Sequence, residues 1–194
     1  MLTLVVVLGV PWALSACARG GADSSASAGP DTSASASPTT DLPAEQAAAR
    51  EVALAMPAPE RPENMDENSP EGAIATATYF VQLYPYVYAT GDLEQWRSMT
   101  RQDCLFCHSG ITELHDAGGW VDPWVHTINE TGYSDPGPGS EYSRVDVAFA
   151  QEAVYTYDGT GSPPEVDDPK DRTLLILAMK YEDGHWVIRG GQVK

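Results

Sequence analysis

The chain has 194 residues and a formal net charge of −17, with 28 acidic and 11 basic side chains. This length accommodates one ordinary domain with appended segments. A surface so negative repels nucleic acid and anionic lipid head groups, so we expect direct binding to neither of them.

The chain opens with an apolar, uncharged segment between Leu2 and Trp12. It has the length of a signal-peptide core and is too short to span a bilayer. The core ends in the sequence LSAC, whose last residue is Cys17, and this is the lipobox pattern of bacterial lipoproteins. Residues 1–16 are therefore predicted to be a lipoprotein signal peptide. The alternative is an ordinary signal peptide with a chance cysteine.

Cys17 is the predicted lipid-attachment site, where the thiol receives a diacylglyceryl group and the peptidase cuts in front of it. Several acyl chains, such as palmitate, make an effectively permanent anchor, because each buried CH₂ contributes about 0.8 kcal/mol. We expect the protein on the extracytoplasmic face of the cell membrane, attached through this lipid alone.

Residues 17–58 are predicted to be the lipidated cysteine and a tether. Between Ala18 and Thr40 the chain is mostly Ala, Ser, Gly, Thr and Pro, a composition that buries little and stays disordered. Residues 42–56 are Ala-rich and predict a short helix, alone and marginal. The folded domain is expected over residues 59–194.

The sequence contains capping residues at both ends of the first predicted helix of the domain. Ser69 is a natural N-cap, Pro70 suits the first helical position, and Gly91 suits the left-handed position that ends a helix. Pro85, inside the pattern, is expected to kink or split the helix. One apolar stripe at helical spacing indicates core packing; it consists of Ala73, Ala77, Phe80, Val81, Tyr84 and Tyr88.

Two shorter helices are predicted next. Asp92 can cap the first of them, with Gln95 completing a capping box and Trp96 on the buried side. Asp103 can cap the second, which should then continue to the Gly-Gly pair at 118–119.

The sequence CLFC at 104–107 opens that last helix and allows three interpretations. With Cys17 acylated in an oxidising compartment, a structural disulfide between Cys104 and Cys107 is favoured. A redox-active pair would also use a helix N-terminus, but it normally follows a strand. Zinc would add His108 and His115 as ligands, although an adjacent Cys and His strain a tetrahedral site. We expect the disulfide, and neither a metal nor another cofactor.

Alternating apolar residues after the helices predict strands. The first is expected over residues 120–129, with Trp124 on its apolar face and Pro123 marking an edge or a bulge. A long pattern over 143–157 blurs at Gln151, which suggests a bulge.

The most apolar strand is expected over residues 173–181, at the centre of the sheet. Asp183-Gly184 predicts a two-residue hairpin turn into a return strand. Helices followed by consecutive antiparallel strands predict an α+β fold, with the N-terminal helices packed on one face of a curved sheet of about four strands.

Several short motifs accompany the lipobox: PE and ENSPEG between 62 and 72, YATGD at 88–92, the cysteine pair, and the glycine pair at 118–119. Together they resemble the actinobacterial lipoproteins grouped as domain-of-unknown-function family 6318, over about residues 59–193. The resemblance implies a cone-like domain similar to nuclear transport factor 2, in which helices cross a curved antiparallel sheet with a pocket between them. It implies no activity.

No sequence motif requires chemistry, which favours a non-catalytic module that binds a small apolar ligand or an envelope protein. Its candidate pocket-lining residues are Tyr84, Tyr88, Trp96 and Trp124.

An enzyme is one alternative, because cone folds host isomerases and dehydratases that use an acid–base pair. The only candidate groups are His115, Asp122 and His126, and no catalytic motif contains them. A thiol redox protein using the cysteine pair is the other alternative. Analogy of fold does not choose among these functions.

Overall fold

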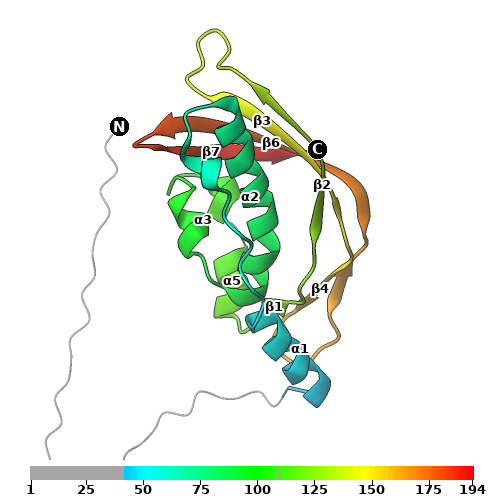
Figure 1. Cartoon of the computed structure of the whole chain (residues 1–194). Helices are drawn as coiled ribbons and strands as arrows, with labels where there is room; N and C mark the ends of the chain where they lie inside the picture. Colours follow the sequence, from blue (N-terminus) through cyan, green and yellow to red (C-terminus); the bar gives the residue numbers. More distant parts are fainter. Residues whose placement is uncertain (1–41, 109) are drawn as a thin grey trace, which may run out of the picture. The chain divides into compact units, whose positions relative to one another are not determined.

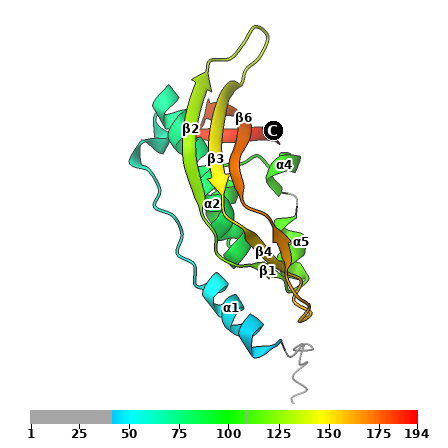
Figure 2. The ribbon, with the colours of Figure 1, turned by 90° about the vertical axis from the view of Figure 1, so that its right-hand side faces the viewer.

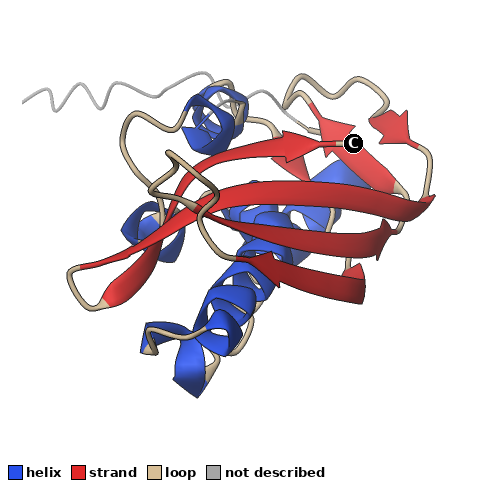
Figure 3. Cartoon of the chain, turned by 90° about the horizontal axis from the view of Figure 1, so that it is seen from above, coloured by secondary structure: helices blue, strands red, loops and turns tan. Residues whose placement is uncertain are grey.

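The computed structural model describes residues 42–108 and 110–194, so the predicted signal peptide, Cys17 and most of the predicted tether lie outside the described residues. The described chain combines helices with two antiparallel sheets. The helices α2, α3 and α5 lie on one face of a curved four-stranded sheet (Figures 1 and 3). The predicted cone-like α+β fold is confirmed.

The helical elements come first in the chain. They are α1 (Ala44–Leu54), the 3₁₀ turn η1 (Glu63–Asp66), α2 (Pro70–Thr90), α3 (Glu94–Ser98), α4 (Leu105–His108) and α5 (Ile111–Asp116). Within the described ranges, none of these helices is both long and apolar enough to cross a membrane.

The strands follow without further helices in the described chain. They are β1 (Trp120–Val121), β2 (His126–Ser134), β3 (Ser143–Gln151), β4 (Val154–Tyr157), β5 (Glu165–Asp167), β6 (Lys170–Glu182) and β7 (His185–Val193). The larger sheet has the order β2-β3-β6-β7 and the smaller one β1-β4-β5. Figure 2 shows β2, β3 and β6 side by side, with β1 and β4 at one end of them.

Helix α2 begins and ends where its sequence predicts. The Ser69 hydroxyl accepts a hydrogen bond from the amide of Gly72 at 3.1 Å, and Pro70 is the first helical residue. Gly91 ends the helix with φ of 75°, a conformation that costs little without a side chain.

Pro85 does not split α2, which continues as one element from Pro70 to Thr90. Of the two outcomes expected at Pro85, a kink or a split, the split does not occur, because burial of the helix outweighs one lost hydrogen bond. Pro85 has no N–H, so it cannot bond the carbonyl of Val81 one turn earlier. That carbonyl finds another donor, as described below.

The capping box predicted at Asp92 does not form. Asp92 does accept from the amide of Glu94 at 3.0 Å, but Gln95 Oε1 instead accepts from the hydroxyl of Tyr79 at 2.7 Å. The last predicted helix is also interrupted: α4 and α5 are separate, and Gly110 before α5 has φ of 89°. A helix cannot continue through that conformation.

The strand predicted over residues 120–129 is two strands in two sheets. Trp120 and Val121 pair with β4 in the smaller sheet, whereas His126 begins β2 in the larger one. Pro123 lies in the link, where it donates no ladder hydrogen bond. The pattern over 143–157 is divided likewise, into β3 and β4, just after the predicted irregularity at Gln151.

Strand β6 lies between β3 and β7 in the larger sheet, as its apolar sequence predicts. The turn from β6 to β7 is Asp183-Gly184, with φ of 51° and 88°. Two successive positive φ values are those of a type I′ turn, so this hairpin prediction is confirmed.

Helix α1 falls within the segment that the sequence assigned to the tether, but it is not alone. Ala53 is fully buried in a cluster with Ala89 of α2 and Trp120 of β1. The amide of Gln46 donates to the carbonyl oxygens of Gly161 and Ser162 at 3.3 and 2.8 Å. The helix is therefore stabilised by packing on the domain.

Candidate functional site

A cavity of about 280 Å³ lies between α2, the helices that follow it and the larger sheet. Small-molecule pockets usually measure roughly 300–1,000 Å³, so this cavity suits a small ligand. Most of its wall is aromatic or aliphatic: Phe80, Val81, Tyr84, Tyr88, Trp96, Phe106, Ile111, Phe149, Leu175 and Val193. The other lining residues are Cys107, His126, Gln151, Lys170 and Thr173.

Three of the four candidate pocket residues lie in this wall, namely Tyr84, Tyr88 and Trp96. Trp96 stacks on Phe80 with a centroid distance of 3.9 Å, and the rings of Tyr84 and Tyr88 are 4.6 Å apart. These contacts fix a continuous aromatic surface along one side of α2.

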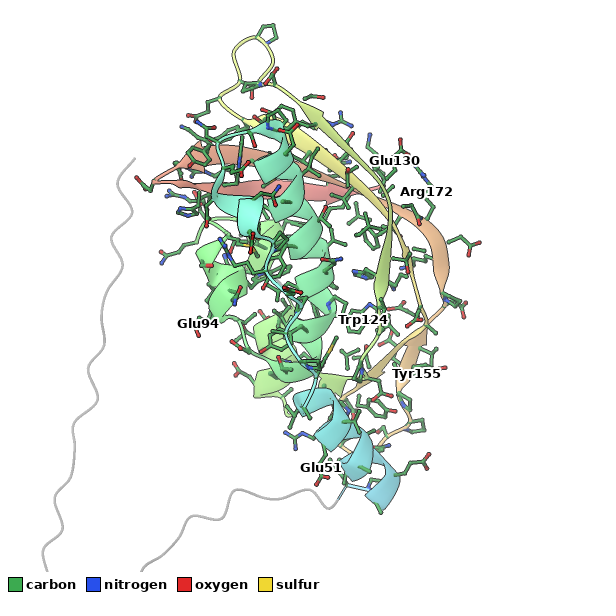
Figure 4. All side chains as sticks on the ribbon, viewed as in Figure 1. Glu51, Glu94, Trp124, Glu130, Tyr155 and Arg172 are labelled. Atoms are coloured by element: carbon green, nitrogen blue, oxygen red, sulfur yellow. A yellow bond between two sulfur atoms is a disulfide. The ribbon has the colours of Figure 1, made fainter. Side chains whose placement is uncertain are left out.

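Trp124 is not among the lining residues. It lies behind the wall, with its ring edge-on to Tyr84 and Tyr88 at 6.1 and 6.3 Å. Figure 4 shows Trp124 on the side of the sheet that faces α2, whereas Glu130 and Arg172 lie on the outer face. Trp124 therefore supports the tyrosines from outside the cavity.

His126 is held by both ring nitrogens. Nδ1 lies 2.9 Å from the carbonyl oxygen of Val81, and because a carbonyl only accepts, Nδ1 carries the proton. Trp124 donates its indole N–H to Nε2 at 3.1 Å. Burial lowers the pKa of His126, against the opposing influence of the Val81 carbonyl and the Gln151 side chain. His126 is thus a neutral part of the wall that also satisfies the carbonyl freed by Pro85.

The other two acid–base candidates lie away from the cavity wall. His115 Nε2 donates to the carbonyl oxygen of Tyr88 at 3.0 Å, and Asp122 accepts from the hydroxyl of Tyr157 at 3.2 Å. Of the three candidates only His126 lines the cavity. The structure therefore brings no pair of them together around a common space.

Cys104 and Cys107 form a disulfide, with their Cα atoms 5.3 Å apart. They are 2% and 1% exposed, so another thiol reaches them only if the segment opens. The carbonyl of Cys107 accepts the indole N–H of Trp96 at 2.7 Å, which ties the disulfide segment to the cavity wall.

The remaining proposed zinc ligands are engaged elsewhere. His108 Nε2 bonds the carbonyl of Arg101 at 2.8 Å, and His115 bonds Tyr88. Across residues 42–108 and 110–194, no three His, Cys, Asp or Glu side chains gather as metal ligands.

Burial raises the pKa of Tyr84, and the neighbouring Tyr88 hydroxyl and the charge of Asp167 act in the same direction. Tyr84 therefore keeps its proton at neutral pH and adds no negative charge to the cavity wall.

Several wall residues were missed by the sequence analysis. Phe149 and Leu175 belong to strand patterns that only predict a buried face. Gln151, Lys170 and Thr173 form a polar end of the cavity, and the blurred alternation at Gln151 was the only local signal for it.

A helix layer on a curved antiparallel sheet, with an aromatic cavity between, defines a cone-like α+β domain. The model of DUF6318, a family of unknown function, matches residues 44–192, and the chain belongs to this family. No curated protein matches the chain. The crystal structure of the intermembrane space region of the chloroplast protein ARC6 is similar, with a TM-score of 0.50 and 11% identity over 66% of this chain and 97% of that one. At this identity the likeness shows a shared fold alone.

Proposed function

We propose that the protein is an extracytoplasmic lipoprotein whose domain binds a small apolar ligand without transforming it. The observation that carries this proposal is the aromatic cavity between α2 and the sheet. Enclosure by apolar side chains with a few polar groups at one end is typical of small-molecule sites. It favours a small ligand over an envelope protein as the binding partner.

The wall chemistry supports binding rather than catalysis. His126 uses both ring nitrogens in hydrogen bonds within the protein, and His115 and Asp122 do not line the cavity. A general base must reach the proton that it removes, so these groups would first have to leave their partners.

The finer fold assignment is also part of the proposal. We assign the domain to the cone domains similar to nuclear transport factor 2, and the helices laid across a curved antiparallel sheet with a cavity between the two layers support this assignment.

The proposed anchor is Cys17, supported by the apolar leader and lipobox sequence in front of it. Mass spectrometry of native protein should find an acylated N-terminal peptide that begins at residue 17. Inhibition of the lipoprotein signal peptidase with globomycin should leave a larger precursor. An unmodified peptide that runs upstream of residue 17 in the mature protein contradicts the anchor.

Ligand binding can be tested with decanol, a neutral apolar probe, by following tryptophan fluorescence, since Trp96 lines the cavity. The predicted mature chain, residues 17–194 carrying Cys17→Ser, is suitable, because it has neither the apolar leader nor the lipid and so needs no detergent. We expect saturable binding of decanol to this chain.

Two neighbouring leucines provide a matched pair of variants. Leu175→Phe places a larger side chain in the cavity and should weaken decanol binding at least several-fold. Leu174→Phe is the control, because Leu174 faces the opposite side of β6 from Leu175. Absence of saturable binding to the parent chain contradicts the proposed function. An equal effect of both variants contradicts the cavity as the site.

A further inference from the structure

The polar end of the cavity is built by an irregularity in strand β6. Phe149 pairs with Thr173, and the next cavity-facing residue of β3, Gln151, pairs with Lys170. The step from Phe149 to Gln151 covers two residues of β3, whereas the matching step from Thr173 to Lys170 covers three residues of β6. Such a bulge changes which side chains point to a given face of a sheet.

Regular pairing would give a different result. In an antiparallel pair without the extra residue, the partner of Gln151 would be Asp171, two residues before Thr173. The observed register places Lys170 there instead, and Lys170 lines the cavity while Asp171 does not. The bulge thus exchanges a carboxylate for an ammonium group at the cavity end.

This charge contrasts with the rest of the molecule. Among the described residues that line the cavity, Lys170 is the one cation and no carboxylate is present. The chain as a whole has 28 acidic residues and a net charge of −17. Because the one charged side chain in the described cavity wall is positive, the cavity is suited to a ligand with an anionic group.

Lys170 is also available to a ligand. Six basic side chains form ion pairs in the described part of the chain, and Lys170 is not one of them. Asp167 of β5, whose charge acts on Tyr84, does not line the cavity. Gln151 and Thr173 lie at the same end and can donate hydrogen bonds to a carboxylate.

Resting on the ligand-binding function proposed above, we propose that the ligand is an amphipathic carboxylate with a single apolar chain. Its chain occupies the aromatic part of the cavity, and its carboxylate pairs with Lys170 beside Gln151 and Thr173. A medium-chain fatty acid has this chemistry.

The proposal is tested with decanoate and decanol, which share a chain and differ in the head group. Titrations use the predicted mature chain, residues 17–194 carrying Cys17→Ser, at neutral pH. This parent should bind decanoate more tightly than decanol. Lys170→Gln should weaken decanoate binding up to about five-fold, as expected for a charge pair with the exposed Lys170, and leave decanol binding unchanged.

Two further variants separate a local from a general charge effect. Arg97→Gln removes one positive charge from the exposed surface of α3, outside the cavity, and should leave decanoate binding unchanged. Lys170→Glu should reverse the preference, so that decylamine binds more tightly than decanoate.

The outcomes distinguish this inference from the proposed function. Equal binding of decanoate and decanol, unaffected by Lys170→Gln, overturns the carboxylate assignment while the apolar binding function stands. Failure of both probes to bind overturns both. Weakening by Arg97→Gln as large as that by Lys170→Gln overturns the role of Lys170.

Discussion

The ring of Phe106 lies directly against the backbone of Gly191. A methyl group on Gly191 would come within 2.5 Å of ring atom Cε1 and 2.6 Å of Cδ1. Phe106 belongs to α4, beside the disulfide, and Gly191 belongs to β7. Phe106 also lines the cavity, so this contact joins a wall residue beside the disulfide to strand β7.

Gly191→Ala should therefore displace Phe106 and lower the free energy of unfolding by about 1–3 kcal/mol, as overpacking does. The matched control is Gly190→Ala on the same strand, where an added methyl group meets no atom within 4 Å. Urea denaturation measures both variants. Equal stabilities of the two variants would contradict the close contact.

Pro85 and His126 should be energetically coupled through the carbonyl of Val81. His126→Phe leaves that carbonyl and the Trp124 indole N–H without partners, at a cost of about 2–4 kcal/mol. In the double variant with Pro85→Ala, the new amide of residue 85 can bond the Val81 carbonyl. We expect a favourable coupling of about 1 kcal/mol in a double-mutant cycle. Strict additivity of the two changes is the result that would refute this relationship.

Stability should depend on pH through His126. Burial lowers the pKa of His126 from its ordinary value of 6.5, so the unfolded chain binds the proton more readily than the folded chain. The contribution of neutral His126 is fully present above about pH 6.5 and is lost as the pH falls toward the folded-state pKa.

Denaturation at pH 7.5, 6.5 and 5.5 should show this loss, with a slope from one proton of at most about 1.4 kcal/mol per pH unit. The His126→Phe variant should lack the part of the pH dependence that comes from His126. The other histidines are present in both proteins, so their contribution cancels in the comparison. The same pH dependence in both proteins would show that His126 does not titrate on unfolding.

Reduction of the disulfide should loosen the cavity wall. Cys104 and Cys107 enclose a short loop, so loop closure predicts a loss of about 2 kcal/mol in the Cys104→Ser/Cys107→Ser variant. Decanol binding should weaken in parallel, because Phe106 and Cys107 line the cavity. Reductant should reproduce both effects in the parent chain and leave the double variant unchanged. Unchanged decanol binding after complete reduction would contradict a role of the disulfide in holding the cavity wall.

Elements with local start and stop signals were predictable from the sequence. Ser69, Pro70 and Gly91 define α2, and Asp183-Gly184 defines the last hairpin, because each feature involves only neighbouring residues. The docking of α1 was not predictable in this way, since its stability comes from contacts with Ala89 and Trp120 far along the chain.

The site residues that could be predicted were likewise those set by local sequence, and those set by distant contacts could not be predicted. The tyrosines of α2 and Trp96 could be named because helical periodicity gives their common face. Lys170 could not be named, because its position depends on a bulge that is visible only when β3 and β6 are paired. Alternation by itself cannot say which sheet a strand joins, so the division of residues 120–129 between two sheets was also missed.

The docking of α1 bears on how far the domain can travel from a lipid at Cys17. If the chain were free up to residue 58, those residues could extend at most roughly 145 Å. With α1 packed against Ala89 and Trp120, only residues 18–43 remain to span the distance, and their limit is roughly 90 Å. For a chain held at the proposed anchor, whatever delivers ligand to the cavity must approach the bilayer to within this shorter reach plus the length of the domain itself.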